Sequence, residues 1–322
     1  MRKIGVGLYG SNGHQIHGLL ENHQAARLVG VAAWEEGKHP VPLKSPAPYR
    51  SYVSLDEMLS DPEVELVSLC SPRRADQAGQ AIACLRAGKH VYAEKPCGMT
   101  EAEIDAILAV STETGRQFHE MAGTALEQPY VALRQVVESG VLGEIVQIFA
   151  QKSYPSAFER RPQDEDVDGG LIRQNAIHAF RMVEHVAGVQ IVDVSAVETT
   201  LGNPVADGGL HIAASFVLRL ENGGVASVVA NYLNPIGMGI WGNEHLRIFG
   251  TNGFVESVDG GARTRLVVGK EDRGALDVSQ PWRDFFDYYV DHLLGNGAMP
   301  FELGEELHPT RMVIRAKEQK LN

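Results

Sequence analysis

Apolar runs alternate with helical patterns in the first third of the chain. The runs that begin at Ile4 and that occupy 64–69 and 90–93 are short and bounded by turn residues, which is typical of buried parallel strands. Between the last two runs, residues 76–86 carry apolar side chains at helical spacing. Five such units within residues 1–122 predict a doubly wound parallel sheet with helices on its faces.

The pattern changes after Gly123. Strands in which apolar and polar residues alternate follow one another, and Asn222-Gly223 and Asn252-Gly253 between them are hairpin signals. These strands are expected at 144–153, 192–199, 211–220, 225–232, 246–250 and 254–258. Because hairpins join antiparallel neighbours, residues 123–322 are predicted to form a separate α+β domain with a large, mostly antiparallel sheet.

The rest of this second domain is expected to be helical or loop. Helices are predicted at 129–139, 171–187, 282–294 and 302–317, and a charged, glycine-closed loop at 164–170. A broad sheet leaves one face that must be covered. This predicts a homo-oligomer, either a dimer or a tetramer.

Composition and charge exclude several classes of protein. A net charge of −12 without a long basic run argues against nucleic acid or an anionic membrane as a partner. No apolar stretch reaches the roughly 20 residues that span a bilayer. Cys70, Cys84 and Cys97 lack paired spacing and are interpreted as buried reduced thiols, which predicts a cytoplasmic protein.

The first predicted strand ends at Gly10-Ser-Asn-Gly13-His-Gln15, and a helical pattern follows. A strand, a glycine-bearing turn and a helix are the context in which a dinucleotide binds, because its pyrophosphate needs close backbone approach and a helix N-terminus. The fingerprint is imperfect, since Asn12 stands at the second glycine position and Gln15 at the last. Asparagine tolerates a left-handed backbone better than most residues, so Asn12-Gly13 can still form a tight turn.

The second predicted strand is followed by Trp34-Glu35-Glu36. In nucleotide-binding sheets this position meets the adenosine ribose. Two glutamates without an arginine disfavour a 2′-phosphate, so NAD is expected as the cofactor rather than NADP. The alternative interpretation is that Glu35 and Glu36 belong to a solvated loop.

Glu94-Lys95-Pro96 follows the predicted strand at 90–93. Proline cannot continue the ladder, so the chain must leave the sheet there, at the edge where open α/β sheets hold their ligands. A lysine beside a carboxylate at that edge can hold or move a proton. The alternative is an ion pair at the start of a loop.

Several motifs follow one another along the chain. They are Cys70-Ser-Pro72, Ala87-Gly-Lys-His-Val-Tyr-Ala-Glu-Lys-Pro96, Ser139-Gly-Val-Leu-Gly-Glu144, Gly169-Gly-Leu with His178, and Leu246-Arg-Ile-Phe-Gly-Thr-Asn-Gly253. Together they resemble the Gfo/Idh/MocA superfamily of nicotinamide-dependent oxidoreductases. The resemblance implies a Rossmann domain followed by a domain for substrate and oligomerisation. With the turn and strand-end arguments, it gives as cofactor-binding candidates Gly10, Ser11, Asn12, Gly13, His14, Gln15, Trp34, Glu35, Ser71, Pro72, Glu94 and Lys95.

The resemblance also implies the catalytic residues. In that family the lysine of Glu-Lys-Pro and a histidine on the first long helix of the second domain face the substrate, which here points to Lys95 and His178. Gln174 replaces a common aspartate, and its i to i+4 spacing would keep it on one helix face with His178. With an unperturbed pKa of about 6.5, histidine suits a general base. Lys95 would orient the substrate hydroxyl or relay its proton, and Gln174 would hydrogen-bond the substrate.

The function expected from these residues is an NAD-dependent dehydrogenase for a sugar, a cyclitol or a related polyol. Two alternatives stay open: an NAD-assisted glycoside-cleaving enzyme of the same fold, and a nucleotide-binding protein that has lost catalysis. Gln174, Asn12 and Ala33 depart from the family pattern and favour the last.

Other polar residues add little to this picture. Arg160, Arg161 and Trp241 could reach the substrate from the second domain. No metal site is expected, since His14-x-x-His17 has no third ligand nearby in the sequence.

Overall fold

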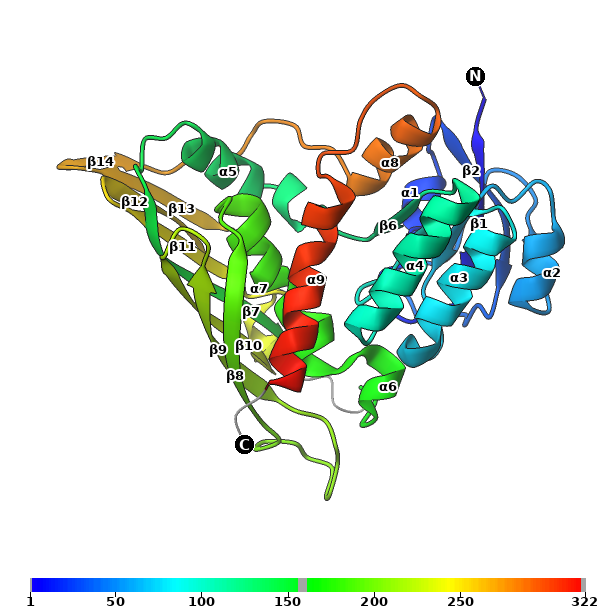
Figure 1. The fold of residues 1–322 in the computed structure, drawn as a ribbon, viewed down its shortest axis with the longest axis horizontal. Coiled ribbons are helices and arrows are strands. Elements are labelled where there is room, and N and C mark those ends of the chain that lie inside the picture. The colour runs from blue at the N-terminus through cyan, green and yellow to red at the C-terminus, as the bar shows by residue number, and fades with distance from the viewer. Residues whose placement is uncertain (1, 156–160, 320–322) are drawn as a thin grey trace. The chain divides into compact units, whose positions relative to one another are not determined.

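The chain forms two compact units (Figure 1). A computed structural model describes residues 2–155 and 161–319. The first unit comprises Met1–Met121, Asp166–Gly169 and Phe285–Glu306, and the second Ala122–Glu165, Gly170–Asp284 and Leu307–Asn322. Within the described ranges, no helix combines the length and the apolar character that a membrane crossing needs.

A parallel sheet of six strands, in the order β3-β2-β1-β4-β5-β6, forms the centre of the first unit. Its strands are β1 (Ile4–Tyr9), β2 (Ala26–Ala32), β3 (Arg50–Ser51), β4 (Leu66–Leu69), β5 (His90–Ala93) and β6 (Phe118–Glu120). Nearly every residue of β1, β4 and β5 is buried, because helices cover both faces of the sheet. The predicted doubly wound sheet is confirmed. Its order reverses between β1 and β4, and open α/β sheets bind ligands at the carboxyl ends of their strands at such a point.

Helices from both ends of the chain pack on this sheet. They are α1 (His17–Leu20), α2 (Leu55–Ser60), η1 (Arg74–Asp76), α3 (Gln77–Arg86), α4 (Glu101–Thr114) and α8 (Phe285–Leu293), and Figure 1 shows α3 and α4 side by side. Thr100 and Glu103 form a capping box at the start of α4. Tyr289 of α8 donates hydrogen bonds to the carbonyl oxygens of Val91 (3.2 Å) and Gln117 (2.9 Å), so α8 is tied to β5 and to the start of β6.

The second unit is built on a sheet of eight strands, in the order β14-β13-β12-β11-β7-β10-β9-β8. The strands are β7 (Ile145–Pro155), β8 (Ile191–Thr199), β9 (Ala213–Leu220), β10 (Val225–Asn234), β11 (His245–Gly250), β12 (Gly253–Val258), β13 (Arg263–Val268) and β14 (Glu271–Gly274). Neighbours run antiparallel except β7 and β10, which are parallel. The predicted mostly antiparallel sheet is confirmed. The strands β13 and β14 were not predicted: β13 reads Arg-Thr-Arg-Leu-Val-Val, without alternation of apolar and polar residues, and β14 reads Glu-Asp-Arg-Gly, without an apolar side chain.

One helix of the second unit differs from its prediction. The helix expected at 171–187 is a π-helix, η3 (Leu171–Ala176), then α7 (Ile177–Arg181), then a second π-helix, η4 (Met182–Val186). A π-helix bonds residue i to i+5 and is wound slightly wider than an α-helix, so residues four apart still lie on roughly the same face. The shared face expected for Gln174 and His178 therefore stays a prediction, although the helix type differs from the expected one.

The remaining helices are short or lie late in the chain. They are η2 (Gly123–Leu126), α5 (Tyr130–Glu138), α6 (Glu165–Asp168), η5 (Ile236–Met238) and α9 (Leu303–Glu318). The loop predicted at 164–170 thus contains one helical turn, α6.

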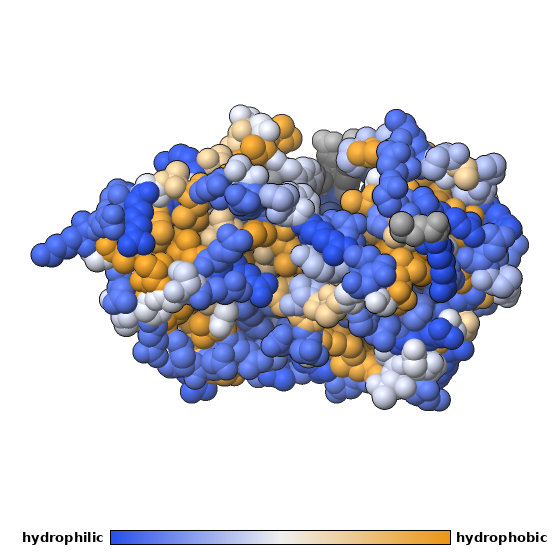
Figure 2. Space-filling view, turned by 90° about the horizontal axis from the view of Figure 1, so that it is seen from above, coloured by the Kyte–Doolittle hydropathy of each residue, from blue (hydrophilic) through white to orange (hydrophobic). Residues whose placement is uncertain are grey.

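One face of the eight-stranded sheet is open and partly apolar. Phe216 and Leu218 point into the core, whereas Val217 between them is 66 % exposed. Val197 of β8 and Val225 of β10 alternate in the same way and are also exposed. In the space-filling view, hydrophobic residues reach the surface between hydrophilic ones (Figure 2). Isolated exposed valines are ordinary, but several on one sheet face are typical of an interface.

Candidate active site

The turn after β1 requires glycine at two positions. Gly10 has φ +74°, and a Cβ there would collide with the carbonyl oxygen of Cys70. Gly13 has φ +113°, and a Cβ there would lie 2.6 Å from Oε1 of Glu94. Only glycine fits both positions. The turn therefore has the tight backbone that a dinucleotide pyrophosphate requires.

Asn12 explains the departure from the glycine fingerprint. Its side-chain amide donates to the carbonyl oxygens of Val167 (2.5 Å) and Pro72 (3.4 Å). Its backbone N–H donates to the carbonyl oxygen of Cys70 at 3.2 Å. The asparagine side chain thus ties the turn to the segment after β4 and to the Asp166–Gly169 segment of the same unit, which a glycine could not do.

His14 and Gln15 use their side chains in different ways. Nδ1 of His14 lies 3.0 Å from Oε1 of Glu94, so the turn contacts the end of β5. Gln15 is buried, donates to the carbonyl oxygen of Gly10 at 3.1 Å and accepts from the Ser68 hydroxyl at 2.5 Å. The Gln15 side chain therefore stabilises the turn from inside the protein, and its part in cofactor binding stays a prediction.

The chain after β2 reaches back to the turn through Ser11, whose hydroxyl accepts the backbone N–H of Glu35 at 3.0 Å. The Glu35 carboxylate is exposed and pairs with Lys38 at 3.0 Å. Trp34 packs against His17 and His39, with ring centroids 5.2 and 5.3 Å away. Burial and the neighbouring His17 lower the pKa of His39 to about 4, so this ring is neutral at pH 7.

Lys95 lies directly after β5 and is buried, with 1 % of its surface exposed. Its ammonium is 3.6 Å from Oε1 of Glu94, which is equally buried. Burial alone would raise the pKa of Glu94, but Lys95 and His14 outweigh it and hold that pKa well below its usual range. Glu94 is therefore a fixed negative charge shared by the turn and the lysine.

Replacing Gly13 with alanine should weaken NAD binding. The new Cβ would press on Glu94 from a left-handed backbone, and strain of this kind corresponds to roughly a tenfold or larger rise in Kd. Titration of protein fluorescence with NAD measures this Kd. Gly18→Ala is the matched control, because no atom lies within 4 Å of a Cβ at that helical position. Equal Kd values for both variants and the wild type would contradict the predicted turn contact.

In the second unit, His178 lies on α7. Its Nδ1 is 3.2 Å from the hydroxyl of Thr124, and its ring meets that of Tyr154 edge-on, with centroids 6.1 Å apart. Thr124 thus contacts one ring nitrogen, and Tyr154 of β7 limits how the ring can turn.

Gln174 lies on η3 and accepts a hydrogen bond from the Tyr232 hydroxyl at 3.3 Å. The Arg161 guanidinium stacks on the ring of Tyr232, 3.8 Å from its centroid. Arg160 lies outside the described residues. Gln174 and Arg161 therefore meet through one buried tyrosine of β10.

Sequence reasoning missed Tyr154 and Tyr232. Both lie near the carboxyl ends of β7 and β10, the one parallel pair within the described part of the eight-stranded sheet. Lys152 lies over the Tyr154 ring at 4.7 Å, and the exposed Trp241 packs beside it at 5.9 Å. Parallel pairing within a mostly antiparallel sheet would have been the signal, but strand direction cannot be read from alternation alone.

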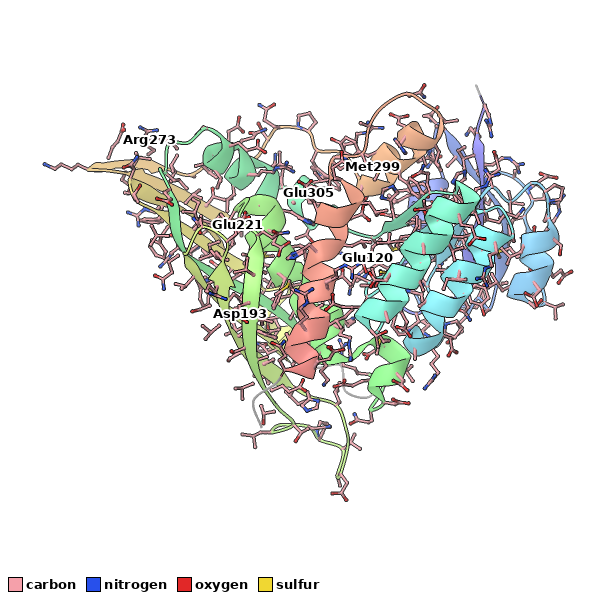
Figure 3. All side chains as sticks on the ribbon, in the orientation of Figure 1. Glu120, Asp193, Glu221, Arg273, Met299 and Glu305 are labelled. Carbon is pink, nitrogen blue, oxygen red and sulfur yellow. The ribbon has the colours of Figure 1, made fainter. Side chains whose placement is uncertain are left out.

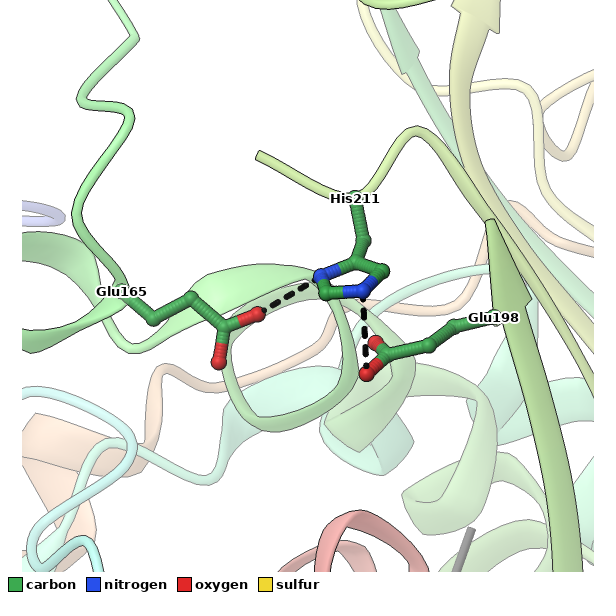
Figure 4. A group of neighbouring side chains, drawn as sticks. All are labelled: Glu165, Glu198 and His211. Atoms are coloured by element: carbon green, nitrogen blue, oxygen red, sulfur yellow. Dashed lines mark hydrogen bonds and ion pairs between the residues drawn. The ribbon is translucent and has the colours of Figure 1, made fainter. Parts of the chain in front are cut away.

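A second polar cluster in this unit is an ion-pair network. His211 lies between Glu165 and Glu198, at 3.0 and 3.4 Å (Figure 4). The three groups have the composition of a metal site. However, the Lys317 ammonium contacts both carboxylates, at 2.7 and 2.6 Å, and supplies the positive charge that they need.

The sequence and the fold match known proteins. Residues 4–121 match the oxidoreductase family with an NAD-binding Rossmann fold, and residues 130–256 match the GFO/IDH/MocA C-terminal domain. The uncharacterized oxidoreductase ORF334 of Rhizobium meliloti is 34 % identical over 276 residues, or 84 % of this chain and 71 % of that one. Myo-inositol 2-dehydrogenase of Thermotoga maritima is 24 % identical over 249 residues, which cover 76 % of this chain and 72 % of that one.

A solved oxidoreductase structure from Thermotoga maritima superimposes with a TM-score of 0.85 at 22 % identity, covering 98 % of this chain and 97 % of that one. The fold and the turn after β1 define a two-domain oxidoreductase with an NAD-binding Rossmann domain. The chain belongs to the Gfo/Idh/MocA family and is a dehydrogenase of that type.

Proposed function

We propose that this protein is an NAD-dependent dehydrogenase for a sugar, a cyclitol or a related polyol. The observation that carries the proposal is the buried Lys95 at the end of β5, paired with Glu94, which in turn contacts His14 of the dinucleotide turn. A cationic donor beside a cofactor turn suits a neutral, hydroxyl-bearing substrate. The similarity to myo-inositol 2-dehydrogenase supports this substrate class.

The catalytic roles follow from the chemistry of the side chains. Bound NAD would supply the hydride acceptor, held by the turn Gly10–Gln15 and by the segments at Trp34-Glu35 and Ser71-Pro72. His178 takes up the proton of the substrate hydroxyl, because neutral imidazole is the side chain suited to that transfer near pH 7. Lys95 donates a hydrogen bond that orients a substrate hydroxyl, and Gln174 hydrogen-bonds the substrate.

The preference for NAD over NADP is also part of the proposal. Glu35 and Glu36 lie after β2, and the neighbouring Lys38 is neutralised by its pair with Glu35. His39 is neutral. The charges that would attract a 2′-phosphate are thus offset, whereas free ribose hydroxyls need no net charge.

Residues 1–122 would bind the dinucleotide and residues 123–322 the substrate. The buried free thiols Cys70, Cys84 and Cys97 suit a reducing compartment, so we place the protein in the cytoplasm.

The test is a panel of sugars, cyclitols and sugar acids incubated with the protein and NAD or NADP. We expect NADH absorbance to rise with at least one neutral polyol and more slowly with NADP. Release of aglycone from aryl glycosides without net NADH would instead favour glycoside cleavage. Tight NAD binding without turnover on any substrate would favour a protein that has lost catalysis.

The open face of the eight-stranded sheet is proposed to be covered by a second copy of the chain. Val217→Lys, in the middle of that face, is expected to reduce the particle mass measured by light scattering after gel filtration. Val53→Lys is the matched control, since Val53 is 94 % exposed in the first unit. A wild-type monomer, or an unchanged mass for Val217→Lys, would refute this arrangement.

A further inference from the structure

Gln77 uses both N–H groups of its side-chain amide on the backbone around Lys95. Its Nε2 donates to the carbonyl oxygens of Glu94 (2.5 Å) and Pro96 (3.0 Å), the residues on either side of Lys95. A side-chain amide nitrogen has two hydrogens, and here each has one acceptor. Gln77 is fully buried at the start of α3. Lys95 thus lies between two anchored carbonyl groups.

The other end of the same amide is also held. Oε1 of Gln77 accepts from the Arg74 guanidinium and from the backbone N–H of Ser71 at 3.3 Å. These donors fix the orientation of the amide, because the flipped form would set its NH₂ against two donors. A second nitrogen of Arg74 donates to the carbonyl oxygen of Asn12 at 2.6 Å. Two buried side chains therefore connect the dinucleotide turn to the lysine.

The far side of this segment is fixed by a carboxylate. Glu120 lies at the end of β6, where Figure 3 labels it, and is fully buried. It accepts the backbone N–H of Cys97 at 2.7 Å. With Gln77 on one side and Glu120 on the other, the segment 94–97 cannot shift without breaking hydrogen bonds inside the protein.

We propose that Gln77 is a positioning residue for the dehydrogenase reaction: by anchoring the carbonyl groups on both sides of Lys95, it aims the ammonium at the substrate hydroxyl. The inference rests on the proposed function. Arg74 holds Gln77 in a fixed position relative to the dinucleotide turn. One chain of hydrogen bonds therefore positions both Lys95 and the cofactor. Gln77 itself touches neither substrate nor cofactor in this role.

Two substitutions separate the parts of the interaction. Gln77→Glu keeps an acceptor for Arg74 but removes both N–H donors, and Gln77→Met removes the polar group at similar length. Both are expected to lower kcat about 10²-fold, since small misplacements of catalytic groups have effects of this size. The Kd for NAD should stay near the wild-type value, because the bond from Arg74 to Asn12 remains.

The matched control is Gln80→Met. Gln80 lies one turn later on α3 and donates to the Tyr9 hydroxyl at 3.3 Å, away from the lysine segment. It should leave kcat and KM unchanged. The proposal is overturned if the Gln77 variants keep kcat within about twofold of wild type, if Gln80→Met loses as much, or if Kd for NAD rises in parallel with the loss of kcat.

Hydrogen exchange separates this proposal from the proposed function. In the ligand-free protein, amide exchange of the peptide 90–99, measured by mass spectrometry, should be at least about tenfold faster in both Gln77 variants than in Gln80→Met. If the wild type turns over no substrate of the panel, the proposed function fails and the anchoring is judged by exchange alone. Unchanged exchange would refute the anchoring.

Discussion

Replacing Lys95 with methionine is expected to lower kcat/KM about 10²–10⁴-fold, the usual effect of losing a group that handles a proton or orients one. The ammonium is buried beside Glu94, so neither water nor a neighbouring exposed lysine can take its place. NAD binding should persist, because the turn keeps its own contacts through Asn12. NADH absorbance with the best substrate and a fluorescence titration with NAD measure the two effects.

Lys89→Met is the matched control for this substitution. Lys89 is also largely buried, but it precedes β5, and its ammonium donates to the carbonyl oxygen of Asp61 at 2.8 Å. Its loss should lower thermal stability and leave kcat/KM near the wild-type value. The assignment of Lys95 is wrong if Lys95→Met keeps kcat/KM within about threefold of wild type, far below the effect of a group in acid–base catalysis.

The second large effect is expected for His178→Asn. Asparagine can still contact Thr124 but cannot take up a proton, so kcat/KM should fall about 10²–10⁴-fold. The wild-type rate should decline at acidic pH as the imidazole becomes protonated, and this decline should be missing from the residual activity of the variant. The pH dependence of kcat/KM for both proteins tests it.

His185→Asn serves as the control on the same helical segment. His185 is buried on η4, one short helix after His178. Its loss is expected to affect stability without changing the pH profile. An acidic decline that persists unchanged in His178→Asn would assign the base to another residue.

The apolar pattern of the sequence predicted most strands of both sheets. The strands Ile4–Tyr9 and His90–Ala93 are buried on both faces, so their residues form short, mainly apolar runs. Few other conformations produce such runs between turn residues. The capping box at Thr100 and the hairpin signal at Asn222-Gly223 are local as well, since all their partners lie within a few residues. The position of Lys95 after a buried strand followed from the same local information.

The sequence alone could not find the contacts that complete the site. In the sequence, Asn12 is only a departure from the glycine fingerprint. The structure shows that its side-chain amide donates a hydrogen bond to the carbonyl oxygen of Val167, far along the chain. Gln77 carries no motif, and its role depends on two carbonyl groups of a segment 17 to 19 residues away. The π-helical turn at Gln174 likewise has no local signature that separates it from an α-helix.

The difference between the features that the sequence predicted and those that only the structure showed has a physical reason. Burial of an apolar side chain is non-directional and repeats with the period of the helix or strand, so it leaves a pattern in the sequence. A hydrogen bond between distant residues is directional and occurs once, so its partners leave no periodic trace. The sequence by itself therefore determined the central strands of the two sheets and the place of Lys95 at a strand end. Only the tertiary structure decided that Arg74, Gln77 and Glu120 would surround that lysine segment.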